Sequence, residues 1–220
     1  MQGQYRRMTT FRSHLVRFAL PLLLALSGSA AQAADKLILA FGDSLMAGYQ
    51  LGPTEGFVPR LQKALTQGGV KAVVHNAGVS GDTSAQGRAR LAWVLASLKS
   101  KPDLAIVELG ANDMLRGLDP AQAQANLDAV VGELRKRQIN VLLAGMIAAP
   151  NLGQDYAKRF NAIYPALARK YRVPLYPFFL AGVAGNRRFQ IADGMHPNPQ
   201  GVDIIVRSII PAVKSALAKR

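Results

Sequence analysis

The stretch KLILAFGDSL, residues 36–45, joins a short apolar run to a Gly-Asp-Ser turn. An apolar run of this length without polar alternation is typical of a strand buried on both faces of a parallel sheet. Further runs of the same character follow along the chain. The predicted strands are residues 36–41, 72–76, 104–109, 141–146 and 173–177.

Helical patterns separate these strands. Leu127, Val131 and Leu134, for example, recur at the spacing of one helix face. Strand–helix alternation predicts an α/β fold, with an open parallel sheet covered by helices on both faces. The predicted helices are residues 56–67, 84–98, 120–138, 156–171 and 199–219.

The start of the chain has the three-part plan of a secretory signal peptide. Residues 1–17 carry four arginines and no acid, residues 18–30 are apolar, and Ala31-Gln32-Ala33 supplies small residues. The apolar part is shorter than the roughly 20 residues that span a bilayer, which argues against an uncleaved anchor. We expect cleavage after Ala33 and a periplasmic or secreted protein. Met8 is an alternative start, since a complete signal follows it.

Residues 34–220 then form one domain with 23 Lys and Arg against 13 Asp and Glu. The basic residues are scattered, so an exported chain of this kind is not expected to bind nucleic acid. Its positive charge favours weak contact with anionic lipid or polysaccharide. The absence of cysteine excludes disulfides and thiolate metal sites.

Polar motifs follow the predicted strands, at the edge where open parallel sheets bind ligands. Ser44 comes directly after the first strand, where a helix N-terminus would place backbone N–H groups beside its hydroxyl. The alternative is that Ser44 only caps that helix. Gly78 offers a backbone N–H without a neighbouring Cβ, and Asn112 offers a side-chain amide. Together these groups predict a site that stabilises an oxyanion.

His196 lies in a Gly/Pro-rich loop, three residues after Asp193. In a tight turn, this spacing lets the carboxylate bind the imidazole Nδ1–H, which leaves Nε2 free to take a serine proton. Asp193 as a plain turn residue is the alternative. His75, at the end of an apolar run, is expected to be structural.

Four motifs together resemble the blocks of the SGNH (GDSL) hydrolases. They are Gly-Asp-Ser-Leu at 42–45, Gly78 after the second strand, Gly-Ala-Asn-Asp at 110–113 and Asp-Gly-Met-His-Pro at 193–197. Residues 107–117 and 156–179 are similar to one subgroup, the exported arylesterases and acyl-CoA thioesterase I/lysophospholipase L1 enzymes.

The resemblance implies that Ser44 is the nucleophile, His196 the general base and Asp193 the residue that orients it. It implies an oxyanion hole formed by the N–H groups of Ser44 and Gly78 and the amide of Asn112. It also implies a three-layer α/β/α sandwich with a flavodoxin-like five-stranded sheet, and no metal or cofactor. Residues 80–83 are expected to form a loop over the site.

The expected activity is hydrolysis of small-molecule carboxylic esters and thioesters by a monomer, through an acyl-enzyme. Apolar residues after the third and fourth strands are expected to line an acyl pocket, with ordinary loop packing as the alternative. These residues are Met114, Leu115, Ile147 and Leu152. A carbohydrate O-acetyl esterase on the same fold is the second reading, and a non-catalytic protein that binds anionic glycan or lipid is a third of another class.

Overall fold

The computed structural model describes residue 3 and residues 35–218. Apart from Gly3, the expected signal peptide therefore lies outside the described residues.

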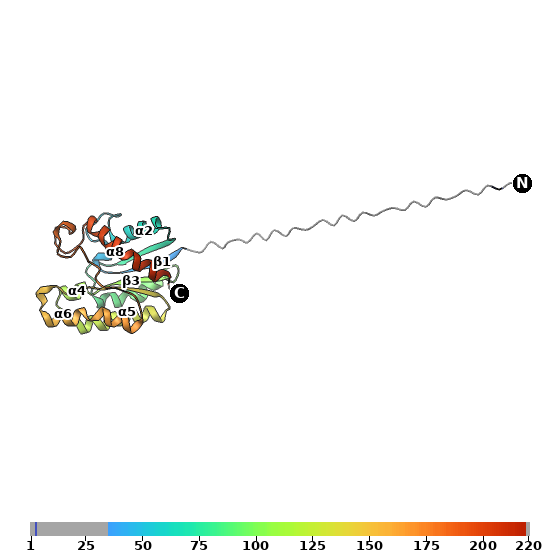
Figure 1. Ribbon diagram of the computed structural model, residues 1–220. Coiled ribbons are helices and arrows are strands. Elements are labelled where there is room, and N and C mark those ends of the chain that lie inside the picture. Colours follow the sequence, from blue (N-terminus) through green and yellow to red (C-terminus); the bar gives the residue numbers. More distant parts are fainter. Residues whose placement is uncertain (1–2, 4–34, 219–220) are drawn as a thin grey trace. The chain divides into compact units, whose positions relative to one another are not determined.

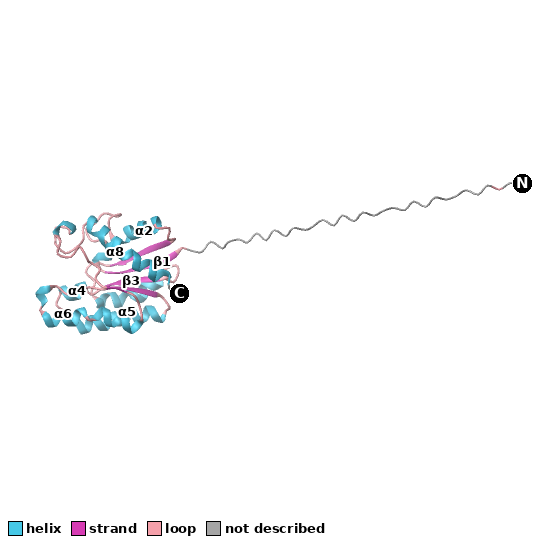
Figure 2. Ribbon diagram, viewed as in Figure 1, coloured by secondary structure: helices cyan, strands magenta, loops and turns pink. Residues whose placement is uncertain are grey.

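Five parallel strands form one sheet in the order β2-β1-β3-β4-β5. Figure 2 shows strands β1 and β3 between the helices. In this register Gly42, the last residue of β1, lies opposite both Gly78 and Glu108. The carboxyl ends of the first three strands therefore meet at one edge of the sheet. The strands are β1 (Lys36–Gly42), β2 (Ala72–Gly78), β3 (Leu104–Glu108), β4 (Asn140–Ala144) and β5 (Leu175–Tyr176).

Helices cover both faces of the sheet, which makes the predicted three-layer sandwich (Figure 1). Helix α2 packs on α8 on one face, and α3, α5 and α7 pack together on the other. The longer helices are α2 (Phe57–Gln67), α3 (Ser84–Ser97), α5 (Pro120–Lys136), α6 (Gln154–Asn161), α7 (Ile163–Tyr171) and α8 (Pro199–Ala218). The short ones are α1 (Ser44–Ala47), α4 (Ala111–Leu115) and the 3₁₀ turns η1 (Pro150–Leu152) and η2 (Arg187–Phe189). None of the helices in the described part has both the length and the apolar content to cross a membrane.

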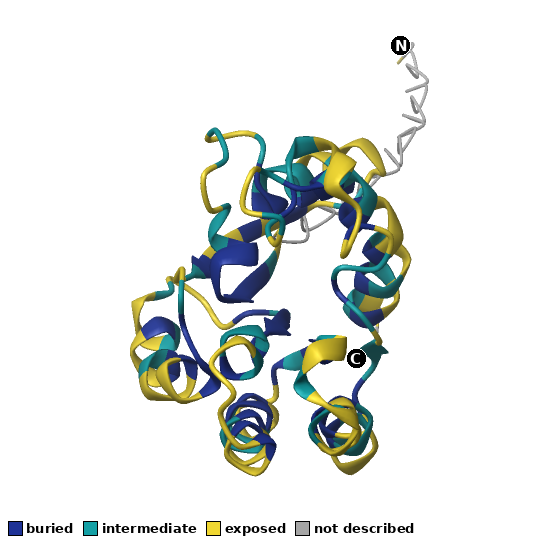
Figure 3. Ribbon diagram, turned by 90° about the vertical axis from the view of Figure 1, so that its left-hand side faces the viewer, coloured by how far each residue is buried: buried dark blue, intermediate teal, exposed yellow. Residues whose placement is uncertain are grey.

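The core lies between the sheet and the inner faces of the helices (Figure 3). Every residue of β3 is buried, as is the predicted apolar stripe of α5. Each fully buried Leu or Val side chain of this kind contributes roughly 1.5–3 kcal/mol relative to an exposed one. This rigid centre holds the strand ends, and the polar groups that follow them, in place.

Two expectations about the strands need correction. β2 is an edge strand that exposes alternate residues, among them Val73 and His75, so it is not buried on both faces. β5 has only two residues instead of the five predicted, because prolines flank it at 174 and 177 and a proline has no N–H for the ladder.

The helix predicted over residues 156–171 is two helices, α6 and α7, separated at Ala162. Pro165 explains the break. Its ring lacks an N–H and clashes with the carbonyl four residues earlier, at Asn161, where α6 ends.

Candidate active site

The nucleophile turn, residues 42–45, connects β1 to α1 at the sheet edge. Asp43 is the N-cap of α1, and its Oδ1 accepts a hydrogen bond from the Leu45 N–H at 3.1 Å. The cap role that was the alternative for Ser44 therefore belongs to its neighbour. Position 42 admits only glycine, because a Cβ there would lie 2.4 Å from the Glu108 carbonyl oxygen.

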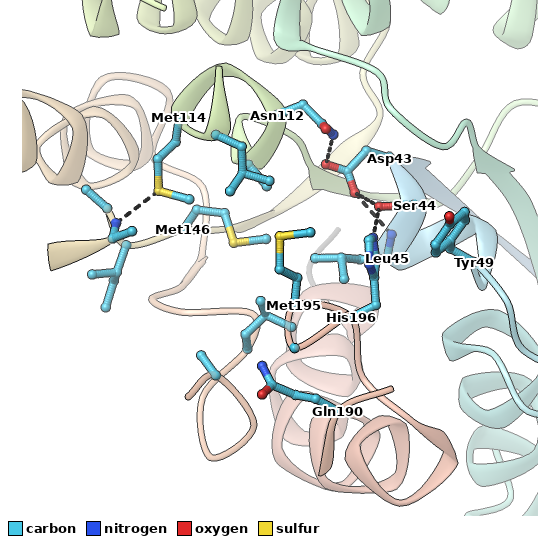
Figure 4. A pocket seen from close by; sticks show the side chains of 18 of the residues that line it. Asp43, Ser44, Leu45, Tyr49, Asn112, Met114, Met146, Gln190, Met195 and His196 are labelled. Carbon is cyan, nitrogen blue, oxygen red and sulfur yellow. Dashed lines mark hydrogen bonds between the residues drawn. The ribbon is translucent and has the colours of Figure 1, made fainter. Parts of the chain in front are cut away.

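The predicted serine, histidine and aspartate lie in one hydrogen-bonded chain. Ser44 Oγ is 2.8 Å from His196 Nε2 (Figure 4). On the other side of the ring, His196 Nδ1 is 2.6 Å from Asp193 Oδ2. With Nδ1 donating to the carboxylate, Nε2 is left to accept the serine proton. This is the tautomer that the spacing of Asp193 and His196 predicts.

The histidine loop, residues 190–197, is held mainly by hydrogen bonds to backbone groups within the loop itself. Asp193 Oδ1 accepts the N–H groups of Met195 at 2.8 Å and His196 at 3.0 Å. Ile191 N–H donates to the His196 carbonyl at 3.0 Å. Burial pushes the pKa of Asp193 upward, but these N–H bonds and the His196 ring outweigh it and hold the pKa below its ordinary value. The carboxylate therefore stays ionised beside the imidazole.

Tyr49 is a neighbour of the histidine that the sequence patterns did not single out. Its ring centroid lies 4.7 Å from that of His196, at an interplanar angle of 42°. The ring packs on the imidazole and limits its rotation.

Buried carboxyl groups hold the nucleophile turn from behind. Asp43 Oδ2 accepts a hydrogen bond from Asn112 Nδ2 at 2.9 Å, and the Asp43 N–H lies 3.4 Å from Glu108 Oε2. Burial raises the pKa of Asp43 to about 6, although hydrogen bonds from Leu45, Glu108 and Asn112 counteract part of this rise. Asp43 is thus ionised at neutral pH and loses its charge in mild acid.

Glu108 is fully buried at the end of β3. Burial and the neighbouring Asp43 charge raise the pKa of Glu108 well above its ordinary value. Its Oε1 has no hydrogen-bond partner among the described residues. A fully buried carboxyl group therefore lies behind the nucleophile turn, a role that no spacing in the sequence indicated.

Asn112, at the start of α4, lies on the wall of the site beside Ser44 (Figure 4). Its amide donates to Asp43 Oδ2 at 2.9 Å and to the Asp82 carbonyl at 3.0 Å. These bonds fix the amide in position next to the place where an oxyanion would develop.

The structure does not bring the Gly78 N–H to the site. That N–H donates to Asn76 Oδ1 at 2.9 Å, and Gly78 is not among the residues that line the cavity. A Cβ at position 78 would lie 2.3 Å from the Ala47 nitrogen, so the glycine is needed for the close approach of α1 to β2.

Gly81 occupies the place expected for Gly78. It lines the cavity together with Ser44 and Asn112, and its N–H has no acceptor among the described residues. Its φ of +86° suits a glycine. Residues 80–83 do form a loop at the site, and the glycine within it was the signal that could have identified this donor.

The loop that carries Gly81 is fastened from both sides. Asp82 pairs with Arg90 at 2.5 Å, and Arg90 also donates to the Gly42 carbonyl at 2.8 Å. Ser84 Oγ donates to Asp113 at 2.6 Å, and the Ser84 N–H donates to the same carboxylate at 2.7 Å. The Gly81 N–H is therefore held at a fixed position relative to the nucleophile turn.

A cavity of about 780 Å³ opens at Ser44 and His196. Three of the predicted pocket residues line it, namely Met114, Leu115 and Ile147. Leu152 does not, since it lies half-buried on η1 outside the lining. The larger apolar lining residues that were not predicted include Leu45, Met146, Phe178, Leu180 and Met195. Within residues 35–218, no group of three or more His, Asp or Glu side chains is placed to hold a metal ion.

A family model described as the GDSL-like lipase/acylhydrolase family matches residues 40–204. Esterase TesA of Pseudomonas aeruginosa is 41% identical over 186 residues, which cover 84% of this chain and 92% of that protein. The thioesterase 1/protease 1/lysophospholipase L1 of Escherichia coli is 39% identical over 187 residues, covering 84% of this chain and 87% of that protein.

Among solved structures, the crystal structure of AlinE4, an SGNH-hydrolase family esterase, has a TM-score of 0.72 and 48% sequence identity to this chain. The match covers 86% of this chain and 100% of that one. It confirms the predicted sandwich with its five-stranded parallel sheet. On these grounds the chain belongs to the GDSL-like lipase/acylhydrolase family of SGNH hydrolases.

Proposed function

We propose that this protein is a serine esterase that hydrolyses small carboxylic esters and thioesters through an acyl-enzyme. The observation that carries the proposal is the hydrogen-bonded chain from Ser44 to His196 to Asp193 at the mouth of an apolar cavity. The esterase and thioesterase names of the relatives support the same reaction class.

In the first step, Ser44 Oγ attacks the carbonyl carbon while His196 Nε2 takes its proton. The ionised Asp193 stabilises the imidazolium that forms. His196 then gives its proton to the departing alcohol or thiol, which leaves the acyl group on Ser44. In the second step, His196 takes a proton from water, the resulting hydroxide attacks the acyl-enzyme, and Ser44 recovers its proton.

We propose that the oxyanion is bound by the N–H groups of Ser44 and Gly81 and by the Asn112 amide. Gly81 replaces Gly78 in this role because its N–H is unpaired and lies on the cavity wall. Asn112 would share one of its hydrogens between the Asp43 carboxylate and the oxyanion. A single donor in such a hole typically contributes roughly 3–4 kcal/mol to transition-state stabilisation.

The apolar wall favours an acyl chain longer than acetyl. Met114, Leu115 and Ile147 line the cavity. Met146 and Phe178 line it as well, and none of these side chains has a polar group for hydrogen bonds to the hydroxyls of a sugar. A carbohydrate O-acetyl esterase would need a more polar cleft, so the acyl esterase is the reading that we retain.

We also propose that the protein works outside the cytoplasm as a monomer. The basis for the location is the signal-peptide pattern of residues 1–33. N-terminal sequencing of the exported protein tests the cleavage after Ala33.

The deciding experiment is hydrolysis of p-nitrophenyl esters from C2 to C16 by wild-type protein and by Ser44→Ala. We expect activity on medium-length chains, and a loss of at least about 10⁴-fold in kcat in the variant, since removal of a triad serine has effects of that order or more. An optimum at C2 alone would favour the acetyl esterase. Wild-type protein without activity on any ester would refute the proposal.

A further inference from the structure

Three methionine side chains line the cavity at the active site, and the proposed reaction uses none of their sulfur atoms. They are Met114, Met146 and Met195, and Figure 4 shows their thioethers among the side chains that line the cavity with Ser44. A thioether is apolar, but a peroxide oxidises it to a sulfoxide, which is polar. Because the sequence contains no cysteine, no thiol of this chain competes for the oxidant.

The exposure of the side chain distinguishes these methionines. Met195 is 48% exposed, whereas Met146 is 3% exposed and Met46, the remaining methionine of the described part, is fully buried. Met114 is partly buried, and its sulfur accepts a hydrogen bond from the Ala149 N–H at 3.1 Å. Since oxidation needs contact between the sulfur and the oxidant, a peroxide in solvent reaches Met195 more readily than the other three.

Met195 lies directly before the catalytic histidine in the histidine loop. Its N–H donates to Asp193 Oδ1 at 2.8 Å, and the N–H of His196 donates to the same oxygen at 3.0 Å. In Figure 4 the Met195 side chain extends from this loop into the cavity. The backbone that carries this thioether is therefore held by the same carboxylate that orients the imidazole.

Oxidation of Met195 would place a polar S=O group in the wall that an acyl chain contacts. An alkyl chain offers the sulfoxide oxygen no hydrogen-bond donor, so a long chain that covers this oxygen binds less well than it does against the thioether. An acetyl group covers less of the wall than an octanoyl chain, so its hydrolysis should change less. The expected signature is therefore a shift in chain-length preference.

We propose that Met195 is an oxidation site, at which a peroxide converts the thioether to a sulfoxide and lowers the hydrolysis of long acyl esters. The sulfur lone pair forms an S–O bond to one peroxide oxygen while the O–O bond breaks. The sulfur loses two electrons and the peroxide gains them, and with hydrogen peroxide the second oxygen leaves as water. The inference rests on the esterase function proposed above and adds a modification that changes its substrate range.

The test measures kcat/KM for p-nitrophenyl octanoate and p-nitrophenyl acetate before and after treatment of the protein with hydrogen peroxide. Peptide mass mapping of the same samples locates each added oxygen. Met195→Leu has no sulfur at this position. Met114→Leu is the matched control, because it removes a sulfur from the same cavity and keeps Met195. Each variant is compared with its own untreated sample.

We expect mapping to find the first added oxygen on Met195, and the octanoate-to-acetate ratio of kcat/KM to fall about tenfold when this residue is fully oxidised. Met114→Leu should show the same fall, whereas Met195→Leu should keep its untreated ratio. Methionine sulfoxide reductases of both types, which reduce the two sulfoxide epimers, should restore the ratio in wild-type protein. Met195→Gln places a polar amide at this position and should have a lower ratio than wild type without any oxidant.

Three results would overturn the inference while leaving the esterase in place. The first is a protein in which Met195 is oxidised and the octanoate-to-acetate ratio is unchanged. The second is uptake of oxygen by Met114 or Met146 before Met195. The third is an equal fall of the ratio in treated Met195→Leu. Untreated wild-type protein that cleaves no ester would instead refute the proposed function and this inference with it.

Discussion

The nucleophile turn and the histidine loop meet at one hydrogen bond, yet they are held in different ways. The turn is supported by residues distant in sequence: Asn112 is 69 positions from Asp43, and Glu108 is 65 positions away. In the histidine loop, Asp193 bonds to the backbone and the ring of His196, three residues later. The turn side is buried, whereas the side chains of Asp193 and His196 are 25% and 18% exposed.

This difference predicts that substitutions in the two regions affect stability and catalysis to different extents. The groups behind the turn are packed into the sheet, so a change there alters both folding and reaction. The Asp193 carboxylate of the histidine loop is partly exposed to solvent, so we expect a change there to alter the reaction with little effect on folding. The three predictions that follow test this division, in order of decreasing effect.

The largest effect is expected for Asp193→Asn. The asparagine oxygen keeps the Met195 and His196 N–H groups, so its NH₂ faces Nδ1. Nδ1 must then accept and Nε2 carries the ring proton, so His196 cannot take the proton of Ser44 and kcat should fall by up to about 10⁴-fold. The midpoint of thermal unfolding should stay close to wild type, because the loop keeps its backbone bonds. Nearly full activity would reduce the triad to a serine–histidine dyad, and a large drop in the midpoint would contradict the division itself.

Asn112→Ala changes the buried side and should affect both quantities. Loss of one oxyanion donor is expected to lower kcat about 10²–10³-fold. The same change removes a hydrogen bond from the buried Asp43 carboxylate, which should also lower the free energy of unfolding by about 1–3 kcal/mol. Steady-state kinetics and urea unfolding of the same variant measure the two effects. An intact kcat would rule out the oxyanion role.

The pH dependence of stability should have opposite signs on the two sides. The pKa of Asp43 rises from 3.8 to about 6 on folding, so the folded state binds the proton more tightly. The contribution of Asp43 to the free energy of unfolding is fully present below pH 3.8 and is lost as the pH rises through about 6. The change is at most about 3 kcal/mol. Asp193, with its lowered pKa, contributes above its ordinary pKa and loses that contribution only at lower pH.

Urea unfolding of wild type and Asp43→Asn between pH 7 and pH 4 measures the buried contribution. Asparagine is also a good N-cap, so the turn should persist in the variant while the gain in stability toward pH 4 becomes smaller. Activity should change in the opposite direction, since protonated Asp43 is a poorer acceptor for Asn112. An unchanged pH profile in the variant would show that Asp43 does not titrate in this range.

Much of the fold followed from local patterns. The buried strands β1, β3 and β4 and the stripe of α5 repeat apolar residues at strand or helix spacing, and that periodicity is visible in one dimension. The exposure of β2 could not be predicted in this way, because it depends on the position of the strand at the edge of the sheet. The break between α6 and α7 was available in the sequence, since Pro165 cannot sit inside one continuous helix.

The site divides in the same way. Asp193 and His196 were predictable as a pair because their contact lies within one turn. Glu108 and Gly81 were not predictable, because the role of each depends on which strand or loop the fold places opposite it. Gly78 matches the family motif, but its role is structural. The missing Cβ lets α1 approach β2, and the Gly78 N–H donates to Asn76.

The distance in sequence between the two reactive groups has a consequence for synthesis. Ser44 and His196 are 152 positions apart, so the ribosome adds most of the domain after the serine and before the histidine. At about 5–20 residues per second, this interval lasts roughly 8–30 s. Throughout that time the nascent chain carries a serine with no base to activate it. Because all five strands precede His196 in the chain, the catalytic serine cannot be activated until the whole sheet has been synthesised.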